Sequence, residues 1–240
     1  MNKIKLDEIE PIKLIGKGNF SNVYEIIYNN KTYAYKEFKT TFYDFKTIDN
    51  IIKLSRQKMN KHYIVPKHIV YGNKKNMLGY LSEYDKELMT LKNIKSTNQL
   101  LQVLKDLKNK IEILHKEYKI IHNDIVKENI LISQDLASYI LDFDSSKKIN
   151  EIPQNNELLR LFIKEYIRNF GYDKNIDVYA FNLLCLTQIY TYPNFDMLFS
   201  DIATNKLTSE NKKVQKLYKE LILEENNNKK YSGEYIIDYI

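Results

Sequence analysis

Two short polar segments in the middle of the chain carry the residue types that phosphoryl transfer needs. The first runs from His122 to Asn129 and contains Asp124, and the second begins at Asp142. A carboxylate can accept the proton of an attacking hydroxyl, while an amide oxygen and a second carboxylate can hold Mg²⁺ against phosphate oxygens. The alternative is a loop of turns and caps, where Asp and Asn are the commonest residues. The combination favours a phosphotransferase, with Asp124 as general base and Asn129 and Asp142 as metal ligands.

A glycine-rich segment and a lysine far upstream strengthen this interpretation. Gly16-Lys17-Gly18 is followed by Val23 and then by Lys36, which lies among apolar residues of an inferred strand. Glycines let a backbone approach phosphates closely, but they also serve tight hairpins, so the two glycines alone are a weak signal. A lysine on such a strand points toward one face of a sheet. The pieces together predict a phosphate site with Lys36 as its cation.

These motifs, in this order, resemble those of eukaryotic-type protein kinases, and the resemblance covers nearly the whole chain. It implies ATP and Mg²⁺ or Mn²⁺ as cofactors, and Asp124, Lys36 and Asn129 as catalytic residues. His122 is implied to be a scaffold residue. The implied nucleotide site consists of the glycine-rich loop, the lysine strand and a hinge: Gly16, Lys17, Gly18, Val23, Ala34, Lys36, Ser82 as gatekeeper, Glu83 and Asp85.

The resemblance also implies a single α+β domain over residues 1–240 with the bilobal kinase-like fold. A β-rich N-lobe with one main helix is expected at about 1–84, a hinge at about 83–88 and a larger, mostly helical C-lobe at about 89–240. Segments 171–181 and 230–237 resemble the buried helix and the closing helix of that C-lobe. Hydrophobic periodicity predicts strands over 11–38 with a hairpin turn at Asn29-Asn30, a helix over 45–59, strands over 68–71 and 77–84, and a helix over 100–114 capped by Ser96 or Thr97.

The predicted helix over 45–59 departs from the family pattern. The family places a glutamate on this helix to pair with the phosphate-binding lysine, but no Glu occurs between Glu37 and Glu83. Asp49 is the better of the two available acids, and Asp44 is the other. An alignment through residues 62–65 instead places Lys53 at the expected position. We therefore expect low activity, or activity switched by a regulatory partner in trans.

Three substitutions near the catalytic segments change what the resemblance implies. Asp144 replaces the glycine that normally follows Asp-Phe, and it is expected either to tune metal binding or to contact solvent. Asn123 replaces the usual arginine, which argues against control by a phosphate on the activation segment. Val126 replaces the usual lysine, with Lys127 displaced by one position, and this blurs the distinction between Ser/Thr and Tyr acceptors.

Composition and charge describe an ordinary soluble enzyme. The net charge of +6 arises from 37 basic and 31 acidic residues that are mixed along the chain, so a dedicated nucleic-acid surface is not expected. The single Cys185 cannot form an intramolecular disulfide and suits a reducing compartment. No apolar stretch reaches the length of about eighteen residues that spans a membrane, and no signal peptide is recognisable. These features predict a cytoplasmic chain.

Three functions are compatible with the sequence. The first is an ATP-dependent protein kinase, Ser/Thr rather than Tyr in type, that acts on a protein substrate or on itself. The second is a small-molecule kinase, because residues 122–124 and 130–132 are also similar to choline and aminoglycoside phosphotransferases; segments 171–181 and 230–237 favour the first. The third is a nucleotide-binding pseudokinase that serves as an interaction module, which the missing glutamate and Asp144 favour.

Overall fold

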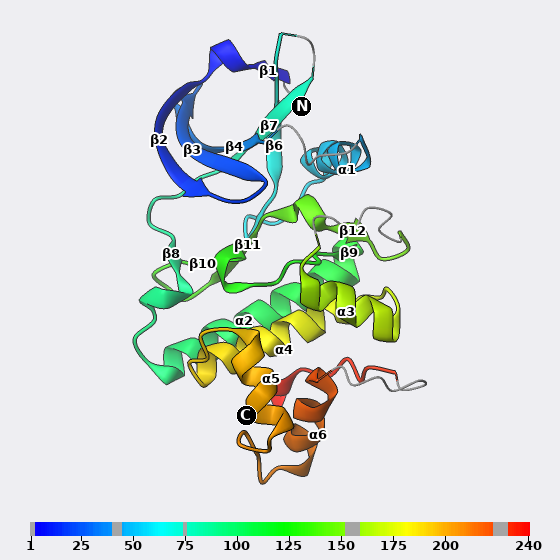
Figure 1. Cartoon of the computed structure of the whole chain (residues 1–240). Coiled ribbons are helices and arrows are strands. Elements are labelled where there is room, and N and C mark those ends of the chain that lie inside the picture. The colour runs from blue at the N-terminus through cyan, green and yellow to red at the C-terminus, as the bar shows by residue number, and fades with distance from the viewer. Residues whose placement is uncertain (1–2, 40–44, 74–75, 152–158, 223–229) are drawn as a thin grey trace. The chain divides into compact units, whose positions relative to one another are not determined.

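The computed structural model describes residues 3–39, 45–73, 76–151, 159–222 and 230–240 (Figure 1). The chain divides into two compact units, of which the first contains residues 1–88 and 139–145 and the second contains residues 89–138 and 146–240. The N-terminal part is rich in strands and the C-terminal part is chiefly helical, so the α+β class predicted from the sequence is confirmed.

The first unit is built on a six-stranded sheet with the order β1-β6-β7-β4-β3-β2. Neighbouring strands pair antiparallel except β1 and β6, which pair parallel. The elements are β1 (Lys3–Lys5), η1 (Leu6–Glu8), β2 (Glu10–Lys17), β3 (Ser21–Tyr28), β4 (Lys31–Phe38), α1 (Phe45–Arg56), β5 (Tyr63–Ile64), β6 (Pro66–Tyr71), β7 (Met77–Glu83) and η5 (Phe143–Ser145). Strand β11 (Ser138–Leu141) pairs through Ile140 and Leu141 with β5.

The hairpin between β3 and β4 turns at the predicted dipeptide. Asn29 and Asn30 have φ angles of 49° and 59°, a conformation that Asn tolerates better than most residues. Two successive residues of this kind form the turn that matches the twist of paired strands. The hairpin prediction is confirmed.

Helix α1 packs on one face of the sheet, and a second apolar cluster covers the other face. Ile51 of α1 joins Phe38, Ile69 and Tyr80 in a buried cluster. The opposite cluster consists of Ile4, Ile9, Ile26, Tyr35, Val70 and Leu81. The predicted helix is confirmed, although it ends at Arg56 rather than at residue 59.

The second unit is formed chiefly by helices, with α2 and α4 lying beside each other (Figure 1). Its helices are α2 (Thr97–Ile113), α3 (Leu161–Phe170), α4 (Asn175–Ile189), α5 (Phe195–Ala203) and α6 (Lys212–Leu221). Short strands form two antiparallel pairs, β8 (Met89–Thr90) with β10 (Ile130–Ile132) and β9 (Ile120–Ile121) with β12 (Lys147–Lys148). The short turns are η2 (Leu91–Asn93), η3 (Leu114–Tyr118), η4 (Lys127–Asn129) and η6 (Ile236–Asp238).

Helices α2 and α4 follow the sequence signals. The Ser96 hydroxyl accepts a hydrogen bond from the backbone N–H of Gln99, so Ser96 caps α2. Helix α4 is buried from Ile176 to Thr187, as the resemblance of residues 171–181 to the buried helix of the family implied. Cys185 is a free, buried thiol in this helix, and burial raises its pKa well above the usual value.

The final segment does not form the closing helix that the resemblance implied. Residues 230–240 contain only the short turn η6. The segment is held instead by Asn182 of α4, whose amide donates to the Tyr231 hydroxyl and the Glu234 carbonyl and accepts from the Ile236 N–H. These bonds satisfy a fully buried amide, and they fix the segment in place although it forms no α-helix.

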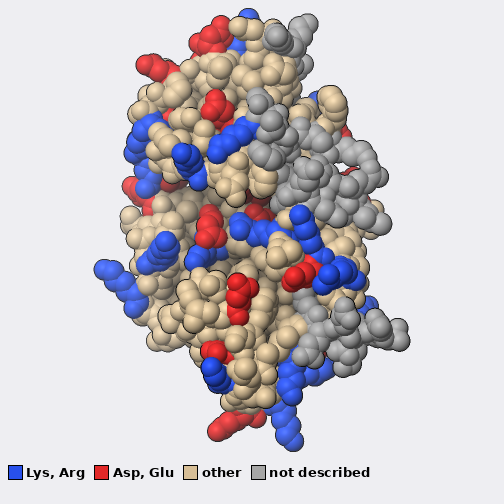
Figure 2. All heavy atoms as spheres, in the orientation of Figure 1, with Lys and Arg blue, Asp and Glu red and all other residues tan. Residues whose placement is uncertain are grey.

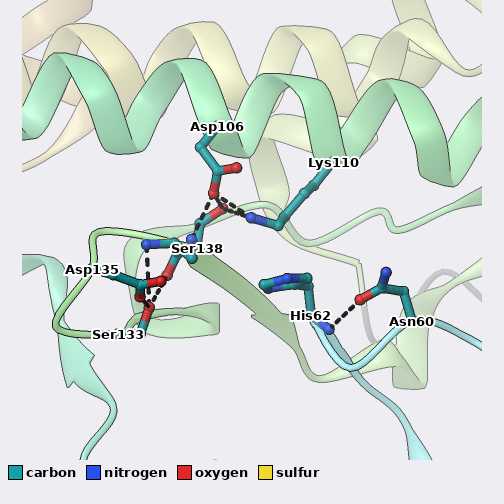
Figure 3. A network of polar contacts seen from close by, with 8 residues as sticks. Asn60, His62, Asp106, Lys110, Ser133, Asp135 and Ser138 are labelled. Atoms are coloured by element: carbon teal, nitrogen blue, oxygen red, sulfur yellow. Dashed lines mark hydrogen bonds and ion pairs between the residues drawn. The ribbon is translucent and has the colours of Figure 1, made fainter.

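A polar network fastens the turn after β10 onto α2 (Figure 3). Asp106 of α2 accepts from the backbone N–H and the hydroxyl of Ser138 at 2.7 and 2.8 Å, and it also pairs with Lys110. Burial pushes the pKa of Asp106 upward, but Lys110 and the Ser138 donors outweigh burial and hold that pKa below its usual value. The network fixes the chain that follows Asn129.

On the face drawn in Figure 2, basic and acidic side chains are interspersed rather than separated. In the part of the chain that the structure describes, no helix combines the length and the apolar character needed to cross a membrane.

Candidate active site

The strand register of the first unit brings several predicted nucleotide-site residues together. Gly16 on β2 lies opposite Val23 on β3, Val23 lies opposite Lys36 on β4, and Lys36 lies opposite Tyr80 on β7. Directly opposite residues of antiparallel strands present their side chains on the same face. The glycine-rich loop, Val23 and Lys36 therefore form one row across the sheet, and the same pairing sets Ala34 opposite the buried Ser82.

The turn between β2 and β3 is tied back to β4. The Gly18 N–H donates to the Ser21 carbonyl at 2.9 Å, and the ammonium of Lys39 donates to the Gly18 carbonyl at 2.5 Å. Ser21, which stands where the family pattern has its third glycine, is buried at the start of β3. These hydrogen bonds hold the turn between β2 and β3 in a defined conformation.

Lys36 is buried and lies between two carboxylates of the segment that follows β11. Its Nζ is 2.5 Å from Asp142 Oδ1 and 2.8 Å from Asp144 Oδ2. Asp142 has a φ of 65°, a left-handed conformation that turns its carboxylate out of the strand direction. Sequence reasoning gave no role to Gly79, yet a Cβ atom there would lie 2.0 Å from the Lys36 carbonyl oxygen, so only glycine lets β7 approach this part of β4.

The sequence left open whether Asp49 pairs with Lys36, and the structure gives Asp49 a different partner. Asp49 pairs instead with Lys53, one turn along α1, at 2.8 Å, and both side chains are about 60% exposed or more. The positions of α1 that face the sheet are occupied by Thr47, Ile51 and Leu54, so the helical phase turns Asp49 toward solvent. The other candidate, Asp44, lies outside the described residues.

The expectation that Asp144 merely contacts solvent is wrong. Its side chain is only 6% exposed, and its second oxygen accepts a hydrogen bond of 2.8 Å from the Tyr80 hydroxyl. Burial and the neighbouring charge of Asp142 raise the pKa of Asp144, and Lys36 and Tyr80 oppose that rise.

The predicted hinge residues Glu83 and Asp85 line a cavity of the first unit. Ser82 is buried, whereas Glu83 is exposed and pairs with Lys67 at 3.3 Å. Glu83 and Asp85 line a cavity of about 1010 Å³ together with Tyr33 and other residues of the strand ends. Gly16, Val23 and Lys36 do not line that cavity, whereas the pairing of β4 with β7 sets Tyr33 opposite Glu83 and Ala34 opposite Ser82.

The second unit holds Asp124 in a defined orientation. The Asn129 side-chain amide donates to the Asp124 carbonyl at 3.0 Å and to its carboxylate Oδ2 at 2.7 Å. The backbone N–H of Asp124 donates to His122 Nδ1 at 3.2 Å, and His122 is fully buried, which agrees with a scaffold role. Asn129 uses its NH₂ group in these contacts, and its carbonyl oxygen is the atom that it has to offer a metal ion.

A buried aspartate on α4 anchors the backbone of this loop. Asp177 accepts from the N–H groups of His122 and Asn123 at 2.7 and 2.8 Å, and its Oδ2 lies 2.8 Å from His115 Nε2. Asn123 has a φ of 66°, so the loop reverses sharply just before Asp124. Sequence reasoning identified the segment around Asp177 but not this contact, which joins residues 54 positions apart.

Asp124 has a further partner that the sequence did not reveal. The guanidinium of Arg160 pairs with Oδ1 of Asp124 through Nε, and its Nη2 lies 3.5 Å from Oδ2. Arg160 directly precedes α3 and is 43% exposed. It places a cation beside the carboxylate in a loop where Val126 replaces the lysine of the family pattern.

We expect Arg160→Ala to lower the KM for the phosphate acceptor by up to about fivefold. An exposed ion pair contributes at most about 1 kcal/mol, and an acceptor hydroxyl has to compete with the guanidinium for Asp124. Initial rates at saturating ATP over a range of acceptor concentrations measure the change, and Arg168→Ala on α3 is the matched control. A rise in the acceptor KM would show that Arg160 assists binding of the acceptor.

The carboxylates that are present fit magnesium better than a protein-enclosed metal centre. Among the described residues, no three His, Cys, Asp or Glu side chains gather closely enough to hold a metal ion. Magnesium commonly uses one or two carboxylates and completes its shell with substrate phosphates and water. The 32% exposed Asp142 carboxylate is suited to that arrangement.

Comparison with known proteins establishes the class of protein. The model of the protein kinase domain family matches residues 9–239. The chain therefore belongs to the protein kinase family, as the sequence motifs predicted.

The similar proteins include both tyrosine and Ser/Thr kinases. The chain is 30% identical over 134 residues to a megakaryocyte-associated tyrosine-protein kinase of Rattus norvegicus, which covers 54% of this chain and 26% of the relative. It is 28% identical over 197 residues to the probable serine/threonine-protein kinase gdt4 of Dictyostelium discoideum, covering 76% and 12%. It is 24% identical over 218 residues to the receptor-like cytosolic serine/threonine-protein kinase RBK2 of Arabidopsis thaliana, covering 81% and 45%. The chain thus spans less than half the length of these relatives.

Proposed function

We propose that the chain is an ATP- and magnesium-dependent protein kinase that phosphorylates Ser or Thr hydroxyls of a protein substrate or of itself. The observation that carries the proposal is the way Asp124 is held. Asn129 fixes its carboxylate, and Asp177 fixes the backbone that precedes it. A carboxylate held in this way is pre-organised to align a hydroxyl and to take its proton.

The chain's own residues divide the chemistry among them. The acceptor oxygen forms a bond to the γ-phosphorus as the bond from that phosphorus to the bridging oxygen breaks, and the hydroxyl proton passes to Asp124. The ammonium of Lys36 offsets negative charge on the phosphates, and the turn of Gly16, Lys17 and Gly18 lets the backbone approach them closely. Asp142 and the Asn129 carbonyl oxygen would hold Mg²⁺, which would supply further neutralisation of charge.

A protein hydroxyl of the Ser/Thr type is the acceptor that the relatives favour. Two of the similar proteins named above are serine/threonine-protein kinases that match 76% and 81% of this chain, whereas the tyrosine kinase matches 54%.

The free, buried thiol of Cys185 supports a reducing, cytoplasmic setting.

A nucleotide-binding pseudokinase is the second candidate, and one observation favours it. In the described part of α1, no acid pairs with Lys36, since Asp49 pairs with Lys53. A chain of this kind would bind ATP without turnover and act through its interactions with partners.

The test is a transfer assay on the purified chain with ATP and Mg²⁺ or Mn²⁺. The acceptors are the chain itself, peptide libraries whose only hydroxyl is Ser, Thr or Tyr, and a panel of alcohols that includes choline and aminoglycosides. We expect transfer to Ser or Thr that stops when EDTA removes the metal and returns when Mg²⁺ is added in excess, because the single ammonium of Lys36 cannot neutralise the triphosphate.

Each other outcome of the assay contradicts a defined part of the proposal. Transfer to an alcohol and not to peptides would assign a small-molecule kinase. A thermal shift with ATP in the absence of transfer to any acceptor would assign the pseudokinase. Transfer that persists in EDTA would exclude the metal role of Asp142 and Asn129.

A further inference from the structure

Lys36 has a second, buried carboxylate neighbour that the family pattern does not supply. Asp144 Oδ2 is 2.8 Å from Lys36 Nζ, and Asp144 Oδ1 accepts from the Tyr80 hydroxyl at 2.8 Å. The side chains of Lys36 and Asp144 are 11% and 6% exposed, whereas that of Asp142 is 32% exposed. Both oxygens of Asp144 are thus engaged by protein donors.

The surroundings of Lys36 make Asp144 its better-fixed partner. The Tyr80 ring centroid lies 6.0 Å from Lys36 Nζ, and Tyr80 itself is packed by Ile51 of α1 and by Phe38. A packed tyrosine that donates to Asp144 holds that carboxylate in one rotamer, and the carboxylate in turn holds a flexible lysine stem. Asp142 is more exposed, so water and cations have access to it.

Charge balance separates the roles of the two aspartates. The two carboxylates beside this one ammonium repel each other, and a cation bound to one of them would relieve that repulsion. A cation has access to the exposed Asp142 and not to the enclosed Asp144. If Asp142 held a cation, Asp144 would be the carboxylate left to Lys36.

The geometry points to Asp144 as the residue that positions Lys36, in place of an acid on α1. This inference rests on the proposed function only in taking Lys36 as a phosphate-binding residue. With Asp144 as its anchor, Lys36 is fixed by the segment that carries Asp142, and its orientation requires no displacement of α1. Asp144 is a positioning residue, since it acts on the phosphates through the ammonium of Lys36.

The test is a double-mutant cycle on Asp144→Asn and Lys36→Met, with the dissociation constants of Mg·ATP and of adenosine measured by calorimetry. We expect Asp144→Asn to weaken ATP binding about tenfold, and to leave adenosine binding within about twofold, because adenosine has no phosphate for Lys36 to bind. In the Lys36→Met background, Asp144→Asn should change ATP binding less than about twofold. Asp49→Asn is the matched control and should leave both ligands unaffected.

Tyr80→Phe is the second variant, and it keeps the packing while removing the hydroxyl that orients Asp144. It should weaken ATP binding about threefold and leave adenosine binding unchanged. Tyr80→Phe also tests the role of Asp144 if the Asp144→Asn variant does not fold.

Three results would overturn the inference: unchanged ATP affinity in Asp144→Asn, an equal loss for ATP and adenosine, or a loss that persists without the Lys36 ammonium. These readouts need no turnover. A chain that shows the predicted binding pattern but transfers no phosphate would therefore refute the proposed function and leave the role of Asp144 standing. A chain that transfers phosphate but shows one of the three results would refute the role of Asp144 alone.

Discussion

Asp124→Asn is expected to slow phosphoryl transfer by about 10²–10⁴-fold while ATP affinity stays within about threefold. Asparagine has nearly the shape of aspartate and keeps an oxygen that can accept from Asn129, so the loop should keep its conformation. It cannot take up the proton of the acceptor hydroxyl, and it loses the negative charge that orients that hydroxyl. Initial rates at saturating ATP and acceptor, together with calorimetric ATP titration, separate the loss of rate from any loss of binding.

Asp135→Asn is the matched control, because Asp135 is an exposed aspartate of the same unit and the chemical change is identical. It should leave the rate unchanged. If Asp124→Asn retained the full rate, Asp124 would not be the base. If instead ATP affinity fell by the same factor as the rate, Asp124 would act in nucleotide binding.

Asp177→Ala is expected to lower the free energy of unfolding by about 3–5 kcal/mol and to abolish transfer. The substitution leaves the buried N–H groups of His122 and Asn123 without their acceptor and removes the partner of His115. Water cannot replace the carboxylate easily, because Asp177 is fully buried. Urea denaturation followed by circular dichroism measures the loss of stability.

Two further variants keep this prediction testable if the alanine variant is insoluble. Asp177→Asn retains one acceptor oxygen and should lose about half as much stability, whereas Asp196→Ala removes an exposed acid of α5 and should change stability by less than about 0.5 kcal/mol. A loss below about 1 kcal/mol in Asp177→Ala would show that the three contacts do not hold the loop.

Local signals explain why much of the fold follows from the sequence. The Asn29-Asn30 turn, the Ser96 cap and the predominantly apolar sequence of α4 are each local signals, determined by residues within a few positions of one another. The closing segment was mispredicted for the opposite reason. Its backbone is held by Asn182, more than 50 positions away, and no local helical pattern is needed.

In the candidate site, too, some residues could be predicted from the sequence and others could not. Lys36 and Asp142 belong to motifs that the resemblance identified, and the structure brings them into contact. The residues that orient them could not be identified in the same way, because they lie far away in the sequence and the directions of their side chains are set by the fold. Asp144 and Lys36 are 108 positions apart by number, and the sequence alone did not show that Asp144 is enclosed. The sequence alone did not decide the partner of Asp49, which in the structure is Lys53, an exposed residue four positions further along α1.

Asp124-dependent phosphorylation of protein is tested most directly by mass spectrometry. Proteins of an expression host, with their own kinases inactivated by heat, are incubated with ATP, Mg²⁺ and either the unaltered chain or Asp124→Asn. We predict phosphorylated Ser and Thr sites, on host proteins or on the chain itself, that are present only with the unaltered chain. The same phosphorylated sites with both forms, or none with either, would contradict the assignment of Asp124 as the base of a protein kinase.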